Sequence, residues 1–159
     1  MKRVLSIVLP LGGILVLVVA VSAWASGSGN ARSAQTGATT ISVVEHATTD
    51  TTTDTGAAND SVGDILTFAN NVFNASDTAK VGTDNGYCLR TVKGAAYECN
   101  WTTSLSGGQI TVEGPFFDAK SSTLAITGGT GRYRGARGTM GLKSRAGGKK
   151  FAFAFHVTG

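Results

Sequence analysis

Apolar and polar positions alternate in short runs along this chain, without the three-to-four-residue repeat of an amphipathic helix. Eight runs of this kind are rich in β-branched and aromatic residues and are separated by Gly, Asn and Ser. They are residues 41–46, 64–73, 86–92, 97–105, 109–117, 122–128, 138–144 and 150–158. Many short strands with such turns are typical of an all-β sandwich or barrel. We therefore predict one all-β domain over residues 41–159.

Two predicted hairpins fix part of the strand pairing. A turn centred on Lys93 and Gly94 places Cys88 directly opposite Cys99. Opposite positions of an antiparallel pair lie within reach of a disulfide. The glycine-containing segment 106–108 joins the next two runs in the same way. We therefore predict a disulfide between Cys88 and Cys99, the two cysteines of the chain.

The last run predicts a strand with two different faces. Phe151, Phe153 and Phe155 alternate with Ala152, Ala154 and His156, so the phenylalanines share one buried face. His156 is predicted to lie at the surface or in an interface. His46 is interpreted in the same way, because it is out of phase with the apolar positions of the first run.

Two segments outside the runs predict little packing. Residues 26–40 are rich in Gly, Ser, Ala and Thr and predict a flexible tether. Residues 47–61 form a low-complexity Thr/Asp stretch, predicted to be a loop that buries almost nothing.

The N-terminus has the layout of a secretory signal peptide. A short basic start precedes an apolar run and a small-x-small site at residues 23–25. The alternative is an uncleaved membrane anchor, since the run approaches the length that spans a bilayer. Cleavage is favoured because Pro10, Gly12 and Gly13 interrupt the run. We therefore predict a signal peptide over residues 1–25 and a secreted protein, whose oxidising surroundings favour the disulfide.

Charge and motifs exclude several classes of function. The chain carries a net charge of +4, and its basic side chains crowd the end, where no acid follows Asp118. Such a basic third could face an anionic polymer, but in an exported protein we expect solvated turns rather than nucleic-acid binding. The glycine-rich segment 128–138 lacks the spacing of a dinucleotide or phosphate loop. A nucleophile elbow is absent too, and two cysteines and two histidines give no credible zinc site.

Glu45 is the acid that stands out. It is in phase with Ile41 and Val43, which places a carboxylate on the apolar face of a strand. Either it lies at a wet barrel mouth, or it lies in a pocket with a perturbed pKa, the usual sign of a functional site. Asp64, Phe68 and Asn70 have similar phasing on the next run, and apolar walls with a few polar groups suit a small-molecule cavity.

Two long segments carry a family resemblance. Residues 63–88 contain G-D-I-L-T-F-A-N and V-G-T-D-N-G-Y-C, and residues 108–143 contain Q-I-T-V-E-G-P-F and A-I-T-G-G-T-G-R-Y followed by G-A-R-G. Together they resemble the allene oxide cyclase family and the related dirigent proteins over residues 41–157. The resemblance implies an eight-stranded antiparallel, calycin-like β-barrel with a hydrophobic cavity, and a homotrimer.

The resemblance also implies roles for individual residues. Allene oxide cyclases convert a fatty-acid epoxide to a cyclopentenone without a cofactor or metal. Glu45 and Asn70 match their catalytic glutamate and asparagine, and Phe68, Cys88 and Phe116 match residues of the cavity. Two features depart from the family pattern: Ala47 replaces a second asparagine, and loop 47–61 has no serine-proline pair. In the family such polar groups help to hold a water on the epoxide oxygen. That set is incomplete here, and strict allene oxide cyclase activity is not expected.

The sequence leaves three functions open. The first is a cavity for a hydrophobic molecule, such as a fatty-acid epoxide, terpenoid or phenol, that guides a cofactor-free cyclisation or isomerisation. The second is a non-catalytic dirigent-like or lipid-binding protein. The third is a basic, envelope-associated protein.

Overall fold

The structure is a computed structural model that describes residues 37–159. The predicted signal peptide and most of the predicted tether lie outside these residues. The described residues form strands β1 (Thr39–His46), β2 (Thr51–Thr53), β3 (Ile65–Asn74), β4 (Lys80–Val92), β5 (Ala96–Leu105), β6 (Gly108–Phe117), β7 (Ser122–Gly129), β8 (Arg137–Arg145) and β9 (Lys150–Thr158), with short 3-10 helices η1 (Gly131–Tyr133) and η2 (Ala146–Gly148). None of the helices within this part of the chain is long and apolar enough to cross a membrane.

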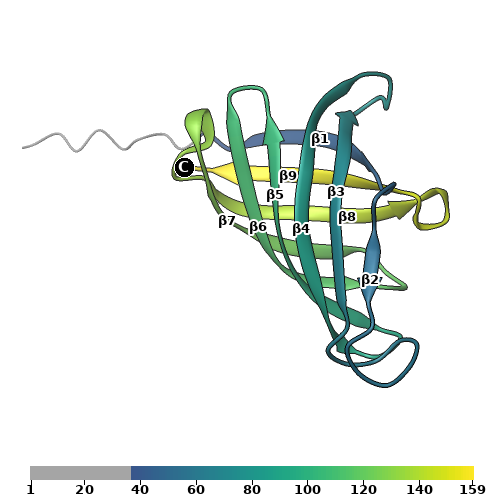
Figure 1. Cartoon of the computed structure of the whole chain (residues 1–159). Helices are drawn as coiled ribbons and strands as arrows, with labels where there is room; N and C mark the ends of the chain where they lie inside the picture. Colours follow the sequence, from purple (N-terminus) through teal and green to yellow (C-terminus); the bar gives the residue numbers. More distant parts are fainter. Residues whose placement is uncertain (1–36) are drawn as a thin grey trace, which may run out of the picture. The chain divides into compact units, whose positions relative to one another are not determined.

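Eight of the strands close into an antiparallel barrel. The order around it is β1-β9-β8-β7-β6-β5-β4-β3, and pairing between β1 and β3 closes the ring. The first and last strands therefore lie side by side (Figure 1). The fold predicted from alternation and from the family resemblance is confirmed.

Both predicted hairpin registers are confirmed. Cys88 pairs with Cys99 across β4 and β5, and the two form a disulfide. Strands β5 and β6 are joined by a tight turn in which Leu105 pairs with Gly108. Strand β4 begins at Lys80, six residues before the predicted run, and this earlier start brings Asp84 into the barrel.

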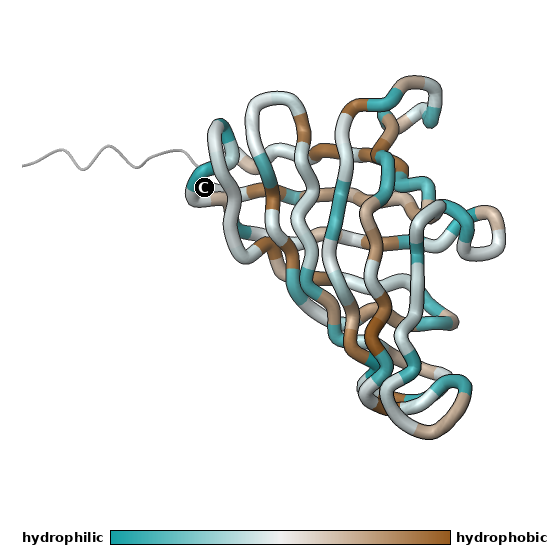
Figure 2. The backbone as a smooth tube through the Cα atoms, viewed as in Figure 1, coloured by the Kyte–Doolittle hydropathy of each residue, from teal (hydrophilic) through white to brown (hydrophobic). Residues whose placement is uncertain are grey.

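The barrel interior is built from alternating side chains. Phe151, Phe153 and Phe155 are buried, whereas His156 on the other face of β9 is exposed, as predicted. Brown and teal segments alternate along the strands in Figure 2, which is the hydropathy pattern of a sheet with one buried face. Fully buried side chains fill the end of the barrel where β1 begins, among them Ile110, Met140 and Phe155.

The glycine-rich segment between β7 and β8 is a tight corner, as predicted. Gly131 has a φ of 58°, and a Cβ there would overlap the backbone carbonyl of Gly107. The backbone N–H of Arg132 donates to that same carbonyl oxygen. Glycine is required because only it combines this φ with so close an approach. The corner thus ties the β7–β8 connection to the β5–β6 turn.

The prediction that residues 47–61 bury almost nothing is confirmed for all but Ser61, the other residues being exposed or half-buried, but the segment is not a loop throughout. Strand β2 pairs with the start of β3, whereas β1 pairs with the end of β3 as far as His46. The two strands therefore lie one after the other along the same edge of β3. Ser61 is buried, and its backbone N–H donates to the buried carboxylate of Asp64. These contacts hold the segment against the barrel because unpaired polar groups would otherwise be buried.

A cluster around Arg90 fastens the same loop. Arg90 forms ion pairs with Asp60 of the loop and with Asp118, and its guanidinium stacks over the ring of Tyr97. The loop therefore covers the end of the barrel where β3 begins and β4 ends. Sequence composition could not reveal this, because the partners come from distant parts of the chain.

Candidate functional site

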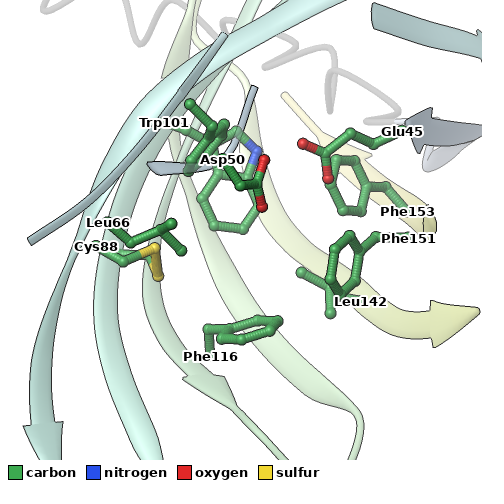
Figure 3. Close-up of a pocket in the computed structure, with 11 residues that line it drawn as sticks. Glu45, Asp50, Leu66, Cys88, Trp101, Phe116, Leu142, Phe151 and Phe153 are labelled. Carbon is green, nitrogen blue, oxygen red and sulfur yellow. A yellow bond between two sulfur atoms is a disulfide. The ribbon is translucent and has the colours of Figure 1, made fainter. Parts of the chain in front are cut away.

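A cavity opens inside the barrel near the end where β1 finishes. It is small, about 40 Å³, and it is mostly apolar (Figure 3). Its lining comes from seven strands and the loop after β1: Glu45, Asp50, Leu66, Phe68, Cys88, Cys99, Trp101, Phe116, Leu142, Phe151 and Phe153. Four of the five predicted site residues, Glu45, Phe68, Cys88 and Phe116, are thus brought together in one cavity wall.

Asn70, the fifth predicted site residue, is not part of the cavity lining but forms hydrogen bonds with the residues at its polar end. Its side-chain oxygen accepts hydrogen bonds from the backbone N–H groups of Thr48 and Thr49 and from the hydroxyl of Thr49. Its amide nitrogen donates to Glu45 at 2.6 Å and to Asp50 at 2.7 Å. One amide therefore shapes the turn after β1 and holds two carboxylates.

Glu45 lies in the cavity wall, as the second of the two interpretations predicted, and not at a wet barrel mouth. It is 5% exposed. Burial raises the pKa of its carboxyl from 4.5 to about 7, the hydrogen bond from Asn70 lowers that pKa, and the charge of Asp50 raises it. A carboxyl with this pKa is present in both protonation states near neutral pH, which suits it to donating and accepting protons.

Asp50 shares the polar end of the cavity with Glu45. Figure 3 shows both carboxylates at one end and Phe116 at the opposite end. No pattern in the sequence indicates Asp50, because it belongs to a loop without periodicity and is positioned by its hydrogen bond from Asn70. It comes from the turn that begins at Ala47, where the family pattern has a second asparagine.

Asp84 is a further acid that the sequence analysis missed. It is fully buried on β4, opposite Asn70 on one side and Thr103 on the other. Within residues 37–159 neither of its carboxylate oxygens has a hydrogen-bond partner. Burial, followed by the charges of Glu45 and Asp50, raises its pKa from 3.8 to about 9. Asp84 is therefore a neutral acid at neutral pH, adjacent to the cavity's polar end.

The aromatic wall contains one unused hydrogen-bond donor. Trp101 is 3% exposed, and in the described part of the chain its indole nitrogen has no partner. Figure 3 shows this nitrogen at the edge of the Trp101 ring on the side of the two carboxylates. The ring of Trp101 packs against Phe68 and Phe153, with ring centroids 5.9 and 5.7 Å away.

The disulfide also belongs to the cavity wall. Cys88 and Cys99 both line it and are bonded to each other. The disulfide predicted between them is therefore confirmed, and it presents its sulfur atoms as part of the cavity wall. Residues 37–159 contain no group of three or more His, Cys, Asp or Glu side chains arranged to hold a metal ion.

Asp64 and His46 have surroundings that their phasing in the sequence does not indicate. Asp64 is buried, but backbone N–H groups of Ser61 and Thr55 bind its carboxylate and lower its pKa, so it anchors the loop. His46, predicted at the surface, is half-buried. It stacks on Phe73, and its Nε2 lies 2.6 Å from a carboxylate oxygen of Asp77, which also binds Lys150.

Known structures share this barrel. A pyocyanin demethylase is 27% identical, with a TM-score of 0.63, over 74% of this chain and all of that one. The pterocarpan synthase dirigent protein GePTS1 is 18% identical, with a TM-score of 0.66, over 76% of this chain and 87% of that one. The Diels-Alderase AbnU is 15% identical, with a TM-score of 0.63, over 77% of this chain and 97% of that one.

A family model agrees with the structural comparisons. The model described as the allene oxide cyclase barrel like domain matches residues 44–153. This span covers most of the chain and runs from the end of β1 into β9. The chain therefore belongs to the allene oxide cyclase barrel-like family.

Proposed function

We propose that the barrel binds an apolar small molecule in its cavity and guides a cofactor-free cyclisation or isomerisation. The observation that carries this proposal is Glu45, a carboxylate with a pKa of about 7 set in a wall of aromatic side chains. Membership of the family and the dirigent and Diels-Alderase folds among the similar structures support it. By name, one similar protein is a pyocyanin demethylase.

In this proposal each part of the site has a separate task. Glu45 takes or returns a proton at the reacting end of the ligand, and Asn70 holds the carboxylate in one orientation through its N–H. Phe68, Phe116, Phe151 and Phe153 restrict the ligand to a few conformations. Fixing reactive groups in an attack geometry lowers the entropic barrier of a ring closure, and a proton-transfer group with a pKa near the working pH is the most efficient.

The cavity is too small to hold a ligand of ordinary size unless side chains in its wall move. Ligand sites typically enclose about 300–1,000 Å³, whereas this cavity measures about 40 Å³. Phe68 and Phe116 are partly exposed where they line it, so their rings can turn outward. In our proposal a planar ligand enters between these two rings.

We also propose that the protein is exported and acts as a homotrimer. A disulfide is compatible with an oxidising compartment. The outer faces of β1, β8 and β9 carry small residues, including Ser42, Gly141, Ala152 and Ala154, which line a groove of about 450 Å³. Small residues would let another copy of the chain pack closely against this face. Sedimentation velocity on the purified protein tests the trimer, and a monomer at micromolar concentration would refute it.

The proposed function is tested by identifying the ligand. The protein is purified from its source, and mass spectrometry of the extracted small molecules identifies what it carries. That molecule is then incubated with the wild type, with Glu45→Gln and with Glu98→Gln, a matched change on the exposed face of β5. We expect Glu45→Gln alone to lose conversion. A ligand that all three proteins leave unchanged would show a dirigent-like or lipid-binding role, and unchanged conversion by Glu45→Gln would remove Glu45 from the mechanism.

A further inference from the structure

The cavity combines features that together select the charge of its ligand. Its wall contains five aromatic side chains, Phe68, Trp101, Phe116, Phe151 and Phe153. It also contains two acids, Glu45 and Asp50, and none of the described residues that line it is basic. Aromatic faces and carboxylates both attract a cation, because each presents negative potential to the space that they enclose.

The groups around Glu45 act in the same direction. The titratable neighbours of Glu45 are Asp50, which is exposed, and Asp84, which is buried and neutral, and the charge of Asp50 disfavours a second negative charge. The cations nearby lie elsewhere: His46 and Lys150, next to each other on β1 and β9, point away from the interior and bind Asp77. Arg90 is paired with Asp60 and Asp118. An anionic group in the cavity would therefore meet repulsion from the carboxylates and find no basic side chain among the lining residues.

An independent observation points to a ligand in this space. Trp101 lines the cavity, and its indole N–H is buried and without a partner in the described chain. Buried donors are nearly always paired in folded proteins. This N–H is therefore available to an acceptor atom of a bound molecule, beside the carboxylates that would hold its positive part.

We propose that the natural ligand is a planar organic cation or a heteroaromatic ring with an N-alkylated or protonated nitrogen. The positive nitrogen lies between Glu45 and Asp50, and the ring packs against Trp101 and the phenylalanines. This inference rests on the proposed function and narrows its ligand class. It excludes, as candidate ligands, molecules that would place a carboxylate in the cavity, such as a fatty-acid derivative bound with its carboxylate innermost.

The pH dependence of binding follows from the ionisation of Glu45. A cation binds best when Glu45 is ionised, and the raised pKa makes that ionisation occur near neutral pH. Going from about pH 6 to about pH 8 raises the ionised fraction of such a group roughly tenfold. The affinity for a permanent cation should rise by up to about the same factor, whereas that for a neutral ring of the same shape should not change.

Three probes of similar size separate charge from shape. N-methylpyridinium is a permanent planar cation, toluene is its neutral counterpart, and benzoate is the anion. Binding to the full chain is measured by isothermal titration calorimetry at about pH 6 and about pH 8. The same titrations are made with Glu45→Gln and with the surface control Glu98→Gln.

The inference predicts that N-methylpyridinium binds more tightly than toluene at the higher pH and up to about tenfold more weakly at the lower pH. Glu45→Gln should abolish this pH dependence, and Glu98→Gln should retain it. Toluene that binds as tightly as the cation at both pH values would overturn the charge selection but leave an apolar binding cavity. Tighter binding of benzoate would overturn it as well. If none of the probes binds, both the inference and the proposed function are wrong.

Discussion

Asp84→Asn should stabilise the protein, increasingly so as the pH rises. The substitution keeps the size of the side chain and removes its ionisation. Asp84 keeps its proton in the folded barrel up to about pH 9, whereas its ordinary pKa is 3.8. Between these values the folded state binds one more proton than the unfolded state. Stability is therefore lost as the pH rises through this window.

The magnitude follows from the proton difference. One proton bound more tightly by the folded state costs about 1.4 kcal/mol of stability for each pH unit. From about pH 5 to about pH 8, Asp84 therefore costs the wild type on the order of 4 kcal/mol. Glu45 has a raised pKa too, and its contribution is present in both proteins. The free energy of unfolding of Asp84→Asn minus that of the wild type should grow by this amount.

Urea unfolding followed by circular dichroism at several pH values measures this difference. Asp54→Asn is the matched control, because Asp54 lies in the exposed part of the loop after β2, and its difference from the wild type should stay nearly constant. If the difference between Asp84→Asn and the wild type did not change with pH, Asp84 would not be the neutral buried acid that we describe.

Three further changes test the inner wall of the barrel. Asn70→Ala removes the five hydrogen bonds of one amide, so we expect it to lower the free energy of unfolding by at least about 3 kcal/mol; a loss below about 1 kcal/mol would show that the turn does not depend on it. Serine at both Cys88 and Cys99 should cost roughly 3 kcal/mol, seen as a lower urea midpoint, and an unchanged midpoint would contradict a constraining disulfide. Gly86→Ala should lower the free energy of unfolding by about 1–3 kcal/mol, because its Cβ would overlap β5. Gly128→Ala is the control, because a Cβ at residue 128 would have no atom within 4 Å. Equal stability of these two variants would contradict the packing.

The strands and their registers could be predicted because alternation and turn residues act locally. The pairing of Cys88 with Cys99 needed only the turn at Lys93 and Gly94. Glu45 was found because a carboxylate in phase with apolar residues conflicts with the pattern of a buried face. In these cases the physical cause of the structure lies in residues close together in the sequence.

The polar groups that complete the site could not be predicted in this way. Asp84 lies in a stretch of β4 flanked by Gly82 and Gly86, which weakens the strand signal, although it is in phase with Cys88. Asp50 comes from a loop whose path is set by tertiary hydrogen bonds to Asn70. Their positions depend on contacts between distant segments, which no local pattern encodes.

The most direct test of the account is the titration of Glu45 itself. Carbon-13 chemical shifts of side-chain carboxyls are recorded against pH, and Glu45 is assigned by comparison with Glu45→Gln. We predict that it titrates at about pH 7, and that N-methylpyridinium lowers this pKa because a bound cation favours the carboxylate. Titration near 4.5, the ordinary value, with no response to the cation, would contradict the claim that Glu45 is a buried cavity carboxylate that exchanges protons at neutral pH.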